Sequence, residues 1–217
     1  MIPVVCIAGH SGSGKTTLLE RLVPELKGRG YRVAAIKHTD KDVEWDHPGK
    51  DSWRLAAAGS DQIVLSTPSR VMTSTLVGKD LSLDGALRFV GGDYDIILVE
   101  GFHEAGVPRI EVHRRELGRG LLSDRHGLMA VVSDEKLNVA APQFSWDDVG
   151  GVADLIVRKL LSSRDDVDVG LFVNGVPVRL SPFVAQFIAS TMEGMVSALK
   201  GVGEVSSLDL WVRKKSG

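Results

Sequence analysis

The segment Gly9-His10-Ser11-Gly12-Ser13-Gly14-Lys15-Thr16 decides how the rest of the chain is interpreted. It matches the pattern G-x-x-x-x-G-K-[ST], in which glycines let successive backbone N–H groups face a phosphate and the following helix adds its positive dipole. The apolar run Val4–Ala8 precedes it and the amphipathic pattern Thr16–Lys27 follows it. We therefore predict a phosphate-binding loop between a strand and a helix. A glycine-rich turn that holds no nucleotide is the alternative.

The side chains at the end of this loop suit a bound nucleoside triphosphate. Lys15 has the length and charge to reach the β- and γ-phosphates, and we assign it a catalytic as well as a binding role. The Thr16 hydroxyl is the expected protein ligand of a Mg²⁺ ion. Further nucleotide contacts are expected from the rest of the loop, namely Gly9, Ser11, Gly12, Ser13, Gly14 and Thr17.

Acidic residues after two predicted strands complete the expected metal site. Four apolar residues precede Glu100 in Tyr94–Gly101, as in a buried strand that delivers a carboxylate to the ligand-binding edge of a sheet. Glu100 is therefore a candidate catalytic residue and metal ligand, with a solvated strand-end acid as the alternative. Asp40 is a second metal candidate. An acidic solvated loop is its alternative, because other carboxylates crowd the same stretch, namely Asp42, Glu44 and Asp46.

The sequence gives a weaker indication of which nucleotide base the site would recognise. Guanine-specific P-loop proteins often carry [NT]-K-x-D after a late strand, and the sequence contains no such tetrapeptide. Asp134 follows the predicted strand Leu128–Val132, where its carboxylate could accept hydrogen bonds from N1 and N2 of guanine. A helix cap or a solvated loop acid is the alternative for Asp134. GTP and ATP are therefore not separated by the residues alone.

Apolar runs of strand length alternate with helical patterns, which is typical of βαβ units. We predict an α/β fold of the P-loop NTPase type, a mostly parallel sheet with helices on both faces. Predicted strands are Val4–Ala8, Arg32–Ile36, Ile96–Val99, Arg109–His113 and Leu128–Val132, with a hairpin of Gln62–Ser66 and Arg70–Thr75. Predicted helices are Thr16–Lys27, Ser52–Ala58, Leu81–Val90 and Asp147–Leu161, the last capped by Ser145 or Asp147.

A charged segment, Ser162–Asp166, is the predicted linker between a P-loop domain of residues 1–164 and a small C-terminal unit of residues 168–213. Asn174-Gly175 separates two apolar runs and predicts a hairpin, because both turn residues need positive φ. Ser181-Pro182 is expected to open a helix, and Leu208–Val212 to form a last strand. The expected appendage is therefore ββαβ. We expect its methionine-containing helix to pack into a small core, with a partner surface as the alternative.

The composition is that of an ordinary globular protein: 217 residues, 43% hydrophobic, 25% charged and a formal charge of −2. This balance gives no indication of binding to nucleic acid or to a membrane.

The single cysteine, Cys6, excludes an intrachain disulfide and is expected to be a buried thiol. The N-terminal residues do not resemble a signal peptide, and no run approaches the roughly 20 apolar residues of a membrane span. We expect a cytoplasmic protein.

Several further segments, taken together with the phosphate loop, resemble one family. They are Ile36-Lys37-His38-Thr39, Pro48-Gly49-Lys50-Asp51-Ser52, Ile97–Phe102, Asp124-Arg125-His126 and Val132-Ser133-Asp134. Over about residues 2–162 the chain resembles the molybdopterin-guanine dinucleotide biosynthesis protein B (MobB) family. The phosphate loop is shared by many families, whereas I-K-H-T together with P-G-K-D-S and V-E-G-F is far more specific.

This resemblance implies a P-loop protein that binds GTP with Mg²⁺, hydrolyses GTP slowly and forms a homodimer. It also implies that the protein acts as an adaptor for the guanylyltransferase that joins GMP to molybdopterin. Gly12, Gly14, Lys15 and Thr16 match the family's phosphate loop, and Glu100 matches its acidic strand end. Lys50, Asp51 and Ser52 match its P-G-K-D-S stretch, where Lys50 is either a phosphate or partner contact or a plain surface lysine.

Two other functions share these motifs. A small-molecule kinase using ATP would need an arginine-bearing lid, for which the sequence offers Arg114, Arg115 and Arg119. A nickel-type GTPase metallochaperone is disfavoured, because the chain has no histidine-rich tract and no second cysteine. The six histidines show no zinc-site spacing, and His38 is notable only for its place after the second strand. Hydrolysis is expected to be slow, because no arginine finger or water-orienting glutamine is identified.

Overall fold

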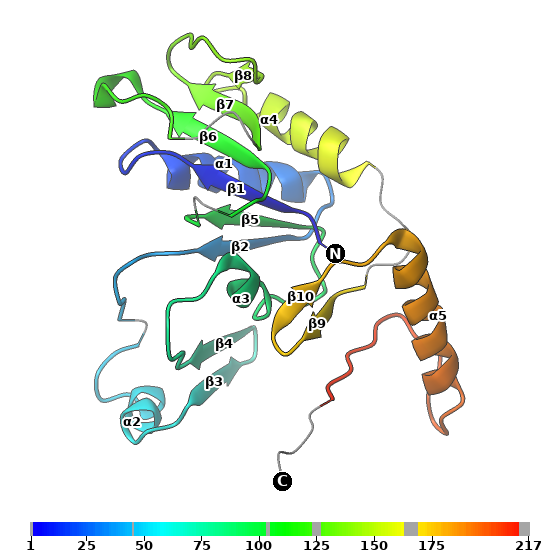
Figure 1. Cartoon of the computed structure of the whole chain (residues 1–217). Coiled ribbons are helices and arrows are strands. Elements are labelled where there is room, and N and C mark those ends of the chain that lie inside the picture. The colour runs from blue at the N-terminus through cyan, green and yellow to red at the C-terminus, as the bar shows by residue number, and fades with distance from the viewer. Residues whose placement is uncertain (1, 45, 103–104, 123–126, 163–168, 213–217) are drawn as a thin grey trace.

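The computed structural model describes residues 2–44, 46–102, 105–122, 127–162 and 169–212 (Figure 1). Its centre is a six-stranded sheet with the strand order β2-β5-β1-β6-β7-β8, in which every neighbouring pair is parallel. The strands are β1 (Val4–Ala8), β2 (Val33–Lys37), β5 (Ile96–Glu100), β6 (Arg109–His113), β7 (Leu128–Ser133) and β8 (Gln143–Phe144). The predicted parallel α/β sheet is therefore confirmed, and β8 is a strand that the sequence analysis missed.

Helices cover both faces of the sheet because alternate strand residues point to opposite sides. On one face, α1 (Lys15–Gly28) and α4 (Val149–Ile156) pack against Val5, Ile7 and their neighbours on other strands. On the other face, the short helix α3 (Leu83–Leu87) packs against Ile97 and Val99. The central strands are buried on both sides, which is why they read as continuous apolar runs.

Helix α1 holds the phosphate loop against the sheet. Its buried residues Leu18, Leu22 and Leu26 recur every fourth position and form one apolar stripe. The helix ends where Arg29 and Gly30 donate backbone hydrogen bonds to Leu26 and Lys27, with Gly30 at φ 91°. The loop therefore continues directly into a helix anchored in the core.

The start of α4 differs from the prediction. The capping side chain is Asp148, which accepts a hydrogen bond of 3.0 Å from the Gly151 N–H, so Ser145 and Asp147 are not the cap. Ser145, Asp147 and Asp148 all carry side chains that can cap a helix, and only the packing of the helix decides which one is used. The helix continues as a π-helical turn, Val157–Leu161.

The predicted hairpin is confirmed as β3 (Gln62–Thr67) paired with β4 (Arg70–Thr75), and it lies beyond the β2 edge of the sheet with α2 (Asp51–Ala57) (Figure 1). Helix α3 is shorter than the predicted Leu81–Val90, because Ser82 caps it and accepts a hydrogen bond from the Gly85 N–H. Leu81 therefore lies outside the helix.

The C-terminal unit has the predicted hairpin, β9 (Leu171–Val173) and β10 (Val176–Val178), with Asn174 at φ 52° and Gly175 at φ 82°. Helix α5 (Pro182–Ser197) follows, capped by Ser181. The predicted last strand Leu208–Val212 is wrong: these residues form no strand, because β9 and β10 pair only with each other. The unit is ββα in its described part. Most of the predicted linker lies outside the described residues, and the domain limits stay a prediction.

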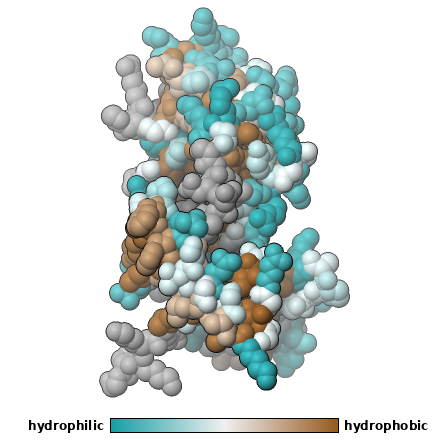
Figure 2. All heavy atoms as spheres, turned by 90° about the vertical axis from the view of Figure 1, so that its right-hand side faces the viewer, coloured by the Kyte–Doolittle hydropathy of each residue, from teal (hydrophilic) through white to brown (hydrophobic). Residues whose placement is uncertain are grey.

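The expected small core around α5 is also wrong. No residue of α5 is buried, and Phe183 and Phe187 are 79% and 63% exposed. Figure 2 shows apolar side chains gathered on the lower half of one face, where Figure 1 places α5. A short hairpin and one helix enclose too little volume to bury an apolar helix on all sides. None of the described helices is long and apolar enough to cross a membrane.

We expect Leu22→Ala to lower the free energy of unfolding by about 2–5 kcal/mol, because it leaves a cavity where α1 meets the sheet. Urea denaturation followed by circular dichroism measures this. Leu55→Ala on α2 is the matched control, since Leu55 is 56% exposed and its loss should cost less than about 0.5 kcal/mol. Equal costs for the two variants would contradict the described core.

Cys6 on β1 is buried, as predicted, and its Sγ donates a hydrogen bond of 3.0 Å to the Gly101 carbonyl. Burial raises the pKa of this thiol to about 11, although the positive charges of Arg109 and Lys15 act in the opposite direction. The thiol is therefore neutral below that pH, and only the thiolate is nucleophilic. We expect an aromatic disulfide reagent at pH 8 to label the folded chain at least about 100-fold more slowly than the guanidinium-unfolded chain. Equal labelling rates would contradict the placement of Cys6.

Candidate nucleotide-binding site

The phosphate loop lies at the carboxyl end of β1, in the middle of the sheet. β1 is hydrogen-bonded to β5 on one side and β6 on the other, with Ile7 opposite Glu100 and Ile110. Because all neighbouring strands are parallel, the segments that leave their carboxyl ends share this edge of the sheet. The candidate site is therefore assembled from loops that are far apart in the sequence.

Two glycines of the loop are required by close contacts rather than by flexibility alone. Gly9 has φ 137°, and a Cβ there would lie 2.4 Å from the Val112 carbonyl oxygen of β6. Gly14 has φ 94°, and a Cβ there would lie 2.4 Å from Cη2 of Trp146. The loop curls in a space that no side chain could enter.

The loop carries a cation and a buried hydroxyl. Lys15 Nζ donates hydrogen bonds of 3.0 Å to the carbonyl oxygens of Gly9 and His10, so its ammonium group lies against the start of the loop. Ser13 is 1% exposed, and its Oγ has no hydrogen-bond partner among the described residues. A buried hydroxyl without a partner is costly, and a phosphate oxygen would satisfy it. Ser11 in the loop and Thr17 in the first turn of α1 are both exposed.

Glu100 meets Thr16 as expected for a metal site. The Thr16 hydroxyl donates a hydrogen bond of 2.8 Å to Glu100 Oε2, and Lys37 Nζ lies 3.2 Å from Glu100 Oε1. Lys37 and Glu100 are opposite each other in the β2–β5 pair. A hydroxyl and a carboxylate in contact are oxygen donors of the kind that Mg²⁺ takes beside nucleotide phosphates. Thr16 and Glu100 therefore fit the ion, which would also compete with Lys37 for the carboxylate.

His38 continues from Lys37 into the same corner. Its N–H donates to the Glu100 carbonyl at 2.8 Å, its ring stacks on Phe102 at 4.2 Å, and its Nε2 lies 3.0 Å from Asp80 Oδ1. Phe102 has φ 50°, which is unusual for a residue with a side chain. The histidine thus ties the ends of β2 and β5 to the segment before α3.

Other predicted residues are not brought into this corner. Asp40 is exposed in a bend after β2, and no described contact joins it to Thr16 or Glu100, so its metal role stays a prediction. Lys50, Asp51 and Ser52 form the start of α2, with Lys50 at the N-cap position. In Figure 1, α2 lies well away from the phosphate loop. The motif Asp124-Arg125-His126 lies outside the described residues.

Asp134 lies beside Arg114, whose guanidinium makes a cation–π contact with Trp146. Its Oδ1 accepts a hydrogen bond of 2.9 Å from the Arg115 N–H, and its Oδ2 lies 3.9 Å from Arg114 Nη1. The Arg115 N–H, more than the charge of Arg114, holds the pKa of the Asp134 carboxyl below its usual range. The Arg114 guanidinium lies 3.8 Å above the ring of Trp146, the residue that also contacts Gly14.

Lys37 and Trp146 belong to the site, although neither was predicted from the sequence. The signal for Lys37 was available, since it directly follows a predicted strand, as Glu100 does. Trp146 follows β8, a two-residue strand with no recognisable pattern of its own. Nothing local could have placed that indole on Gly14.

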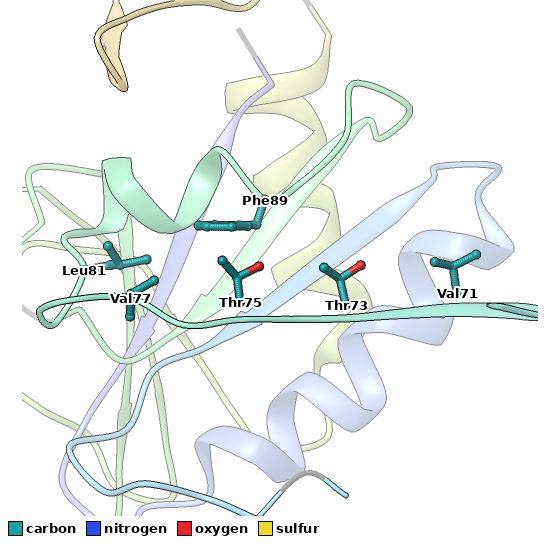
Figure 3. Close-up of a pocket in the computed structure, with 6 residues that line it drawn as sticks. All are labelled: Val71, Thr73, Thr75, Val77, Leu81 and Phe89. Carbon is teal, nitrogen blue, oxygen red and sulfur yellow. The ribbon is translucent and has the colours of Figure 1, made fainter. Parts of the chain in front are cut away.

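A second hollow lies outside this site, between β4 and the segment around α3. Figure 3 shows the side chains that line it, which are Val71, Thr73, Thr75, Val77, Leu81 and Phe89. None of these six is charged, so the hollow does not suit a phosphate. The phosphate loop remains the candidate site.

Known proteins share both sequence and fold with this chain. Residues 4–134, more than half of the chain, match the model of the family described as molybdopterin guanine dinucleotide synthesis protein B. The chain belongs to the MobB family. The match covers the phosphate loop, Glu100 and Asp134, so the resemblance seen in the sequence is confirmed.

Relatives in the MobB family extend over different lengths of this chain. The molybdopterin-guanine dinucleotide biosynthesis adapter protein of Escherichia coli is 41% identical over 73% of this chain and 93% of its own length. The putative adapter protein of Methanocaldococcus jannaschii is 30% identical over 92% of each. The crystal structure of Bacillus subtilis MobB is 26% identical and matches 75% of this chain and all of its own, with a TM-score of 0.60. The sheet is thus shared with MobB proteins, and a quarter of this chain has no equivalent in that structure.

We expect Glu100→Gln to leave nucleotide affinity in EDTA nearly unchanged, and to lower affinity and turnover in Mg²⁺ by about 10- to 100-fold. A neutral amide is a poorer Mg²⁺ ligand and cannot accept from both Thr16 and Lys37 as a carboxylate does. Titration calorimetry and phosphate release with and without Mg²⁺ measure both effects. Glu20→Gln, on the exposed side of α1, is the control. Unchanged Mg²⁺ dependence would remove Glu100 from the metal site.

Proposed function

We propose that this MobB-family chain binds GTP with Mg²⁺ and acts as an adapter in the biosynthesis of molybdopterin guanine dinucleotide. The observation that carries the nucleotide part is the contact between Thr16 and Glu100 at the phosphate loop. The adapter part is supported by the relatives, which are named as biosynthesis adapter proteins. The partner would be the guanylyltransferase that joins GMP to molybdopterin, and the working form a homodimer.

Each residue of the loop has a distinct part in this proposal. Lys15 would leave the carbonyl oxygens of Gly9 and His10 for the β- and γ-phosphates, where it forms stronger charge-assisted bonds. Thr16 and Glu100 would hold the Mg²⁺ ion, which would neutralise phosphate charge. Ser13 Oγ would donate to a phosphate oxygen. Asp134 would accept hydrogen bonds from the guanine edge.

Hydrolysis by this site should be slow. Fast P-loop NTPases use an arginine finger or a water-orienting glutamine, worth about 10³–10⁵ in rate. We identify neither group among the described residues at the loop. A slow GTPase suits an adapter that changes partners between its nucleotide states, and it argues against a catalyst of bulk turnover.

The test is titration calorimetry of the purified chain with GTP, GDP and ATP, with and without Mg²⁺. We expect a clear preference for guanine nucleotides, and we expect Lys15→Ala to weaken GTP binding by about 10- to 100-fold because it removes a charged donor. Lys27→Ala, an exposed lysine at the end of the same helix, is the control. Wild-type affinity in Lys15→Ala would refute the site. Preference for ATP, with phosphorylation of a small acceptor, would favour the kinase alternative.

The adapter part needs a separate measurement. The purified chain would be mixed with the guanylyltransferase, and complex formation would be followed by size-exclusion chromatography with light scattering, which also reports the dimer. We expect a complex, and faster formation of the dinucleotide in the presence of GTP. The absence of both effects would contradict the adapter role while leaving nucleotide binding intact.

A further inference from the structure

The loops after three neighbouring strands meet beside the phosphate loop. Arg114 follows β6, Asp134 follows β7 and Trp146 follows β8. The Cζ of Arg114 lies 3.8 Å from the centre of the Trp146 ring, and its Nη1 lies 3.9 Å from Asp134 Oδ2. The planar guanidinium group thus lies over an indole and near a carboxylate.

This arrangement has the chemistry of a guanine site. Guanine contains a guanidine unit, so its N1–H and N2–H₂ groups present a carboxylate with the same parallel donors as an arginine. Its ring is also planar and stacks on aromatic side chains. Adenine presents an acceptor at N1, which a carboxylate would repel. Guanine, and not adenine, could therefore both cover the Trp146 ring and present donors to Asp134 in place of Arg114.

The indole belongs to the same site as the phosphate loop. Its Cη2 lies so close to Gly14 that a side chain at position 14 would clash with the indole. Arg21 on α1 donates a hydrogen bond of 2.5 Å to the Trp146 carbonyl and lies 3.5 Å from Asp147. Trp146 is thus held against both the loop and the helix. A nucleotide with phosphates on the loop would have its base within reach of this ring.

Asp134 is prepared for a ligand independently of Arg114. The Arg115 N–H orients its carboxylate at 2.9 Å, and the ion pair with Arg114 is long by comparison. Arg114 can therefore leave without releasing the carboxylate. The loop that carries Arg114 is tied to the phosphate loop, because His10 Nε2 lies 3.0 Å from the Gly120 carbonyl oxygen.

We propose that the Arg114 side chain is a stand-in for guanine, which occupies the base site of the nucleotide-free chain on Trp146 and is displaced when a guanine nucleotide binds. The base then stacks on Trp146 and pairs with Asp134. This inference rests on the proposed function, since it requires a nucleotide on the phosphate loop. It makes Arg114 an internal competitor and Trp146 a determinant of base affinity.

The experiment compares GDP, IDP and ADP by titration calorimetry on the full chain and its variants. The Arg114→Ala variant should bind GDP about 2- to 10-fold more tightly, because the base no longer has to displace the arginine side chain from Trp146. Trp146→Ala should bind GDP roughly 10- to 100-fold more weakly, and Trp146→Phe should retain most of the affinity. IDP lacks the exocyclic amine and should bind more weakly than GDP. Arg119→Ala, an exposed arginine of the same loop, is the control.

A second readout reports the displacement itself. Trp146 emission, taken as the difference between the wild type and Trp146→Phe, should change when GDP binds and should change less in Arg114→Ala, where the ring is already uncovered. Melting temperatures confirm that each variant is folded. If Arg114→Ala weakens GDP binding, Arg114 is a ligand of the nucleotide and the inference is wrong.

The outcomes also separate this inference from the proposed function. If the wild type binds GDP while the alanine variants at Arg114 and Trp146 match it in affinity and base preference, the inference is wrong and nucleotide binding stands. If the wild type binds no nucleotide, the proposed function itself is wrong. Equal affinity of the wild type for GDP and ADP would refute the guanine edge as the ligand of Asp134.

Discussion

The position of β1 between β5 and β6 is the constraint on which the site depends. Parallel pairing places Ile7 opposite Glu100, so the loop that leaves β1 meets the carboxylate that ends β5. A shift of one residue in this register would turn Glu100 to the other face and remove its contact with Thr16. The apolar layer under α1 and α4 holds the register, because each strand residue there is buried on its own side. The position of the carboxylate at the edge of the sheet therefore depends on the apolar core beneath it.

The same constraint explains why so many of the site's contacts run to neighbouring loops. Gly9 approaches the backbone of β6, and Gly14 approaches the indole of Trp146. Three cationic side chains of the site already have partners within the chain. Lys15 donates hydrogen bonds to loop carbonyls, Lys37 pairs with Glu100, and Arg114 pairs with Asp134. A bound nucleotide and its metal would replace these partners rather than fill an empty space. Affinity then depends on the difference between two sets of polar contacts, which favours modest and switchable binding.

Much of the fold could be predicted from the sequence because its elements are strongly periodic. β1, β4 and β6 have the predicted bounds, and α1 and β3 differ from prediction by at most one residue at each end. The errors fall where local pattern competes with packing. Leu208–Val212 has strand composition but pairs with no described strand, and α5 has a core-like composition but no buried residue. Ser145, Asp147 and Asp148 could each cap α4, and only Asp148 does. A strand forms only beside another strand, and a core forms only where other elements cover it. Both conditions depend on distant parts of the chain rather than on the short segment itself.

The sequence by itself determined the phosphate loop, the acidic end of β5 and the alternation that makes a parallel sheet, because each is encoded in consecutive residues. Only the tertiary structure decided that Lys37 shares Glu100 with Thr16, and that Arg114 lies on Trp146 beside Asp134. These groups come from strands whose order in the sheet differs from their order in the chain. Contacts across such an order have no fixed spacing in the sequence, so they become visible only when the strands are paired.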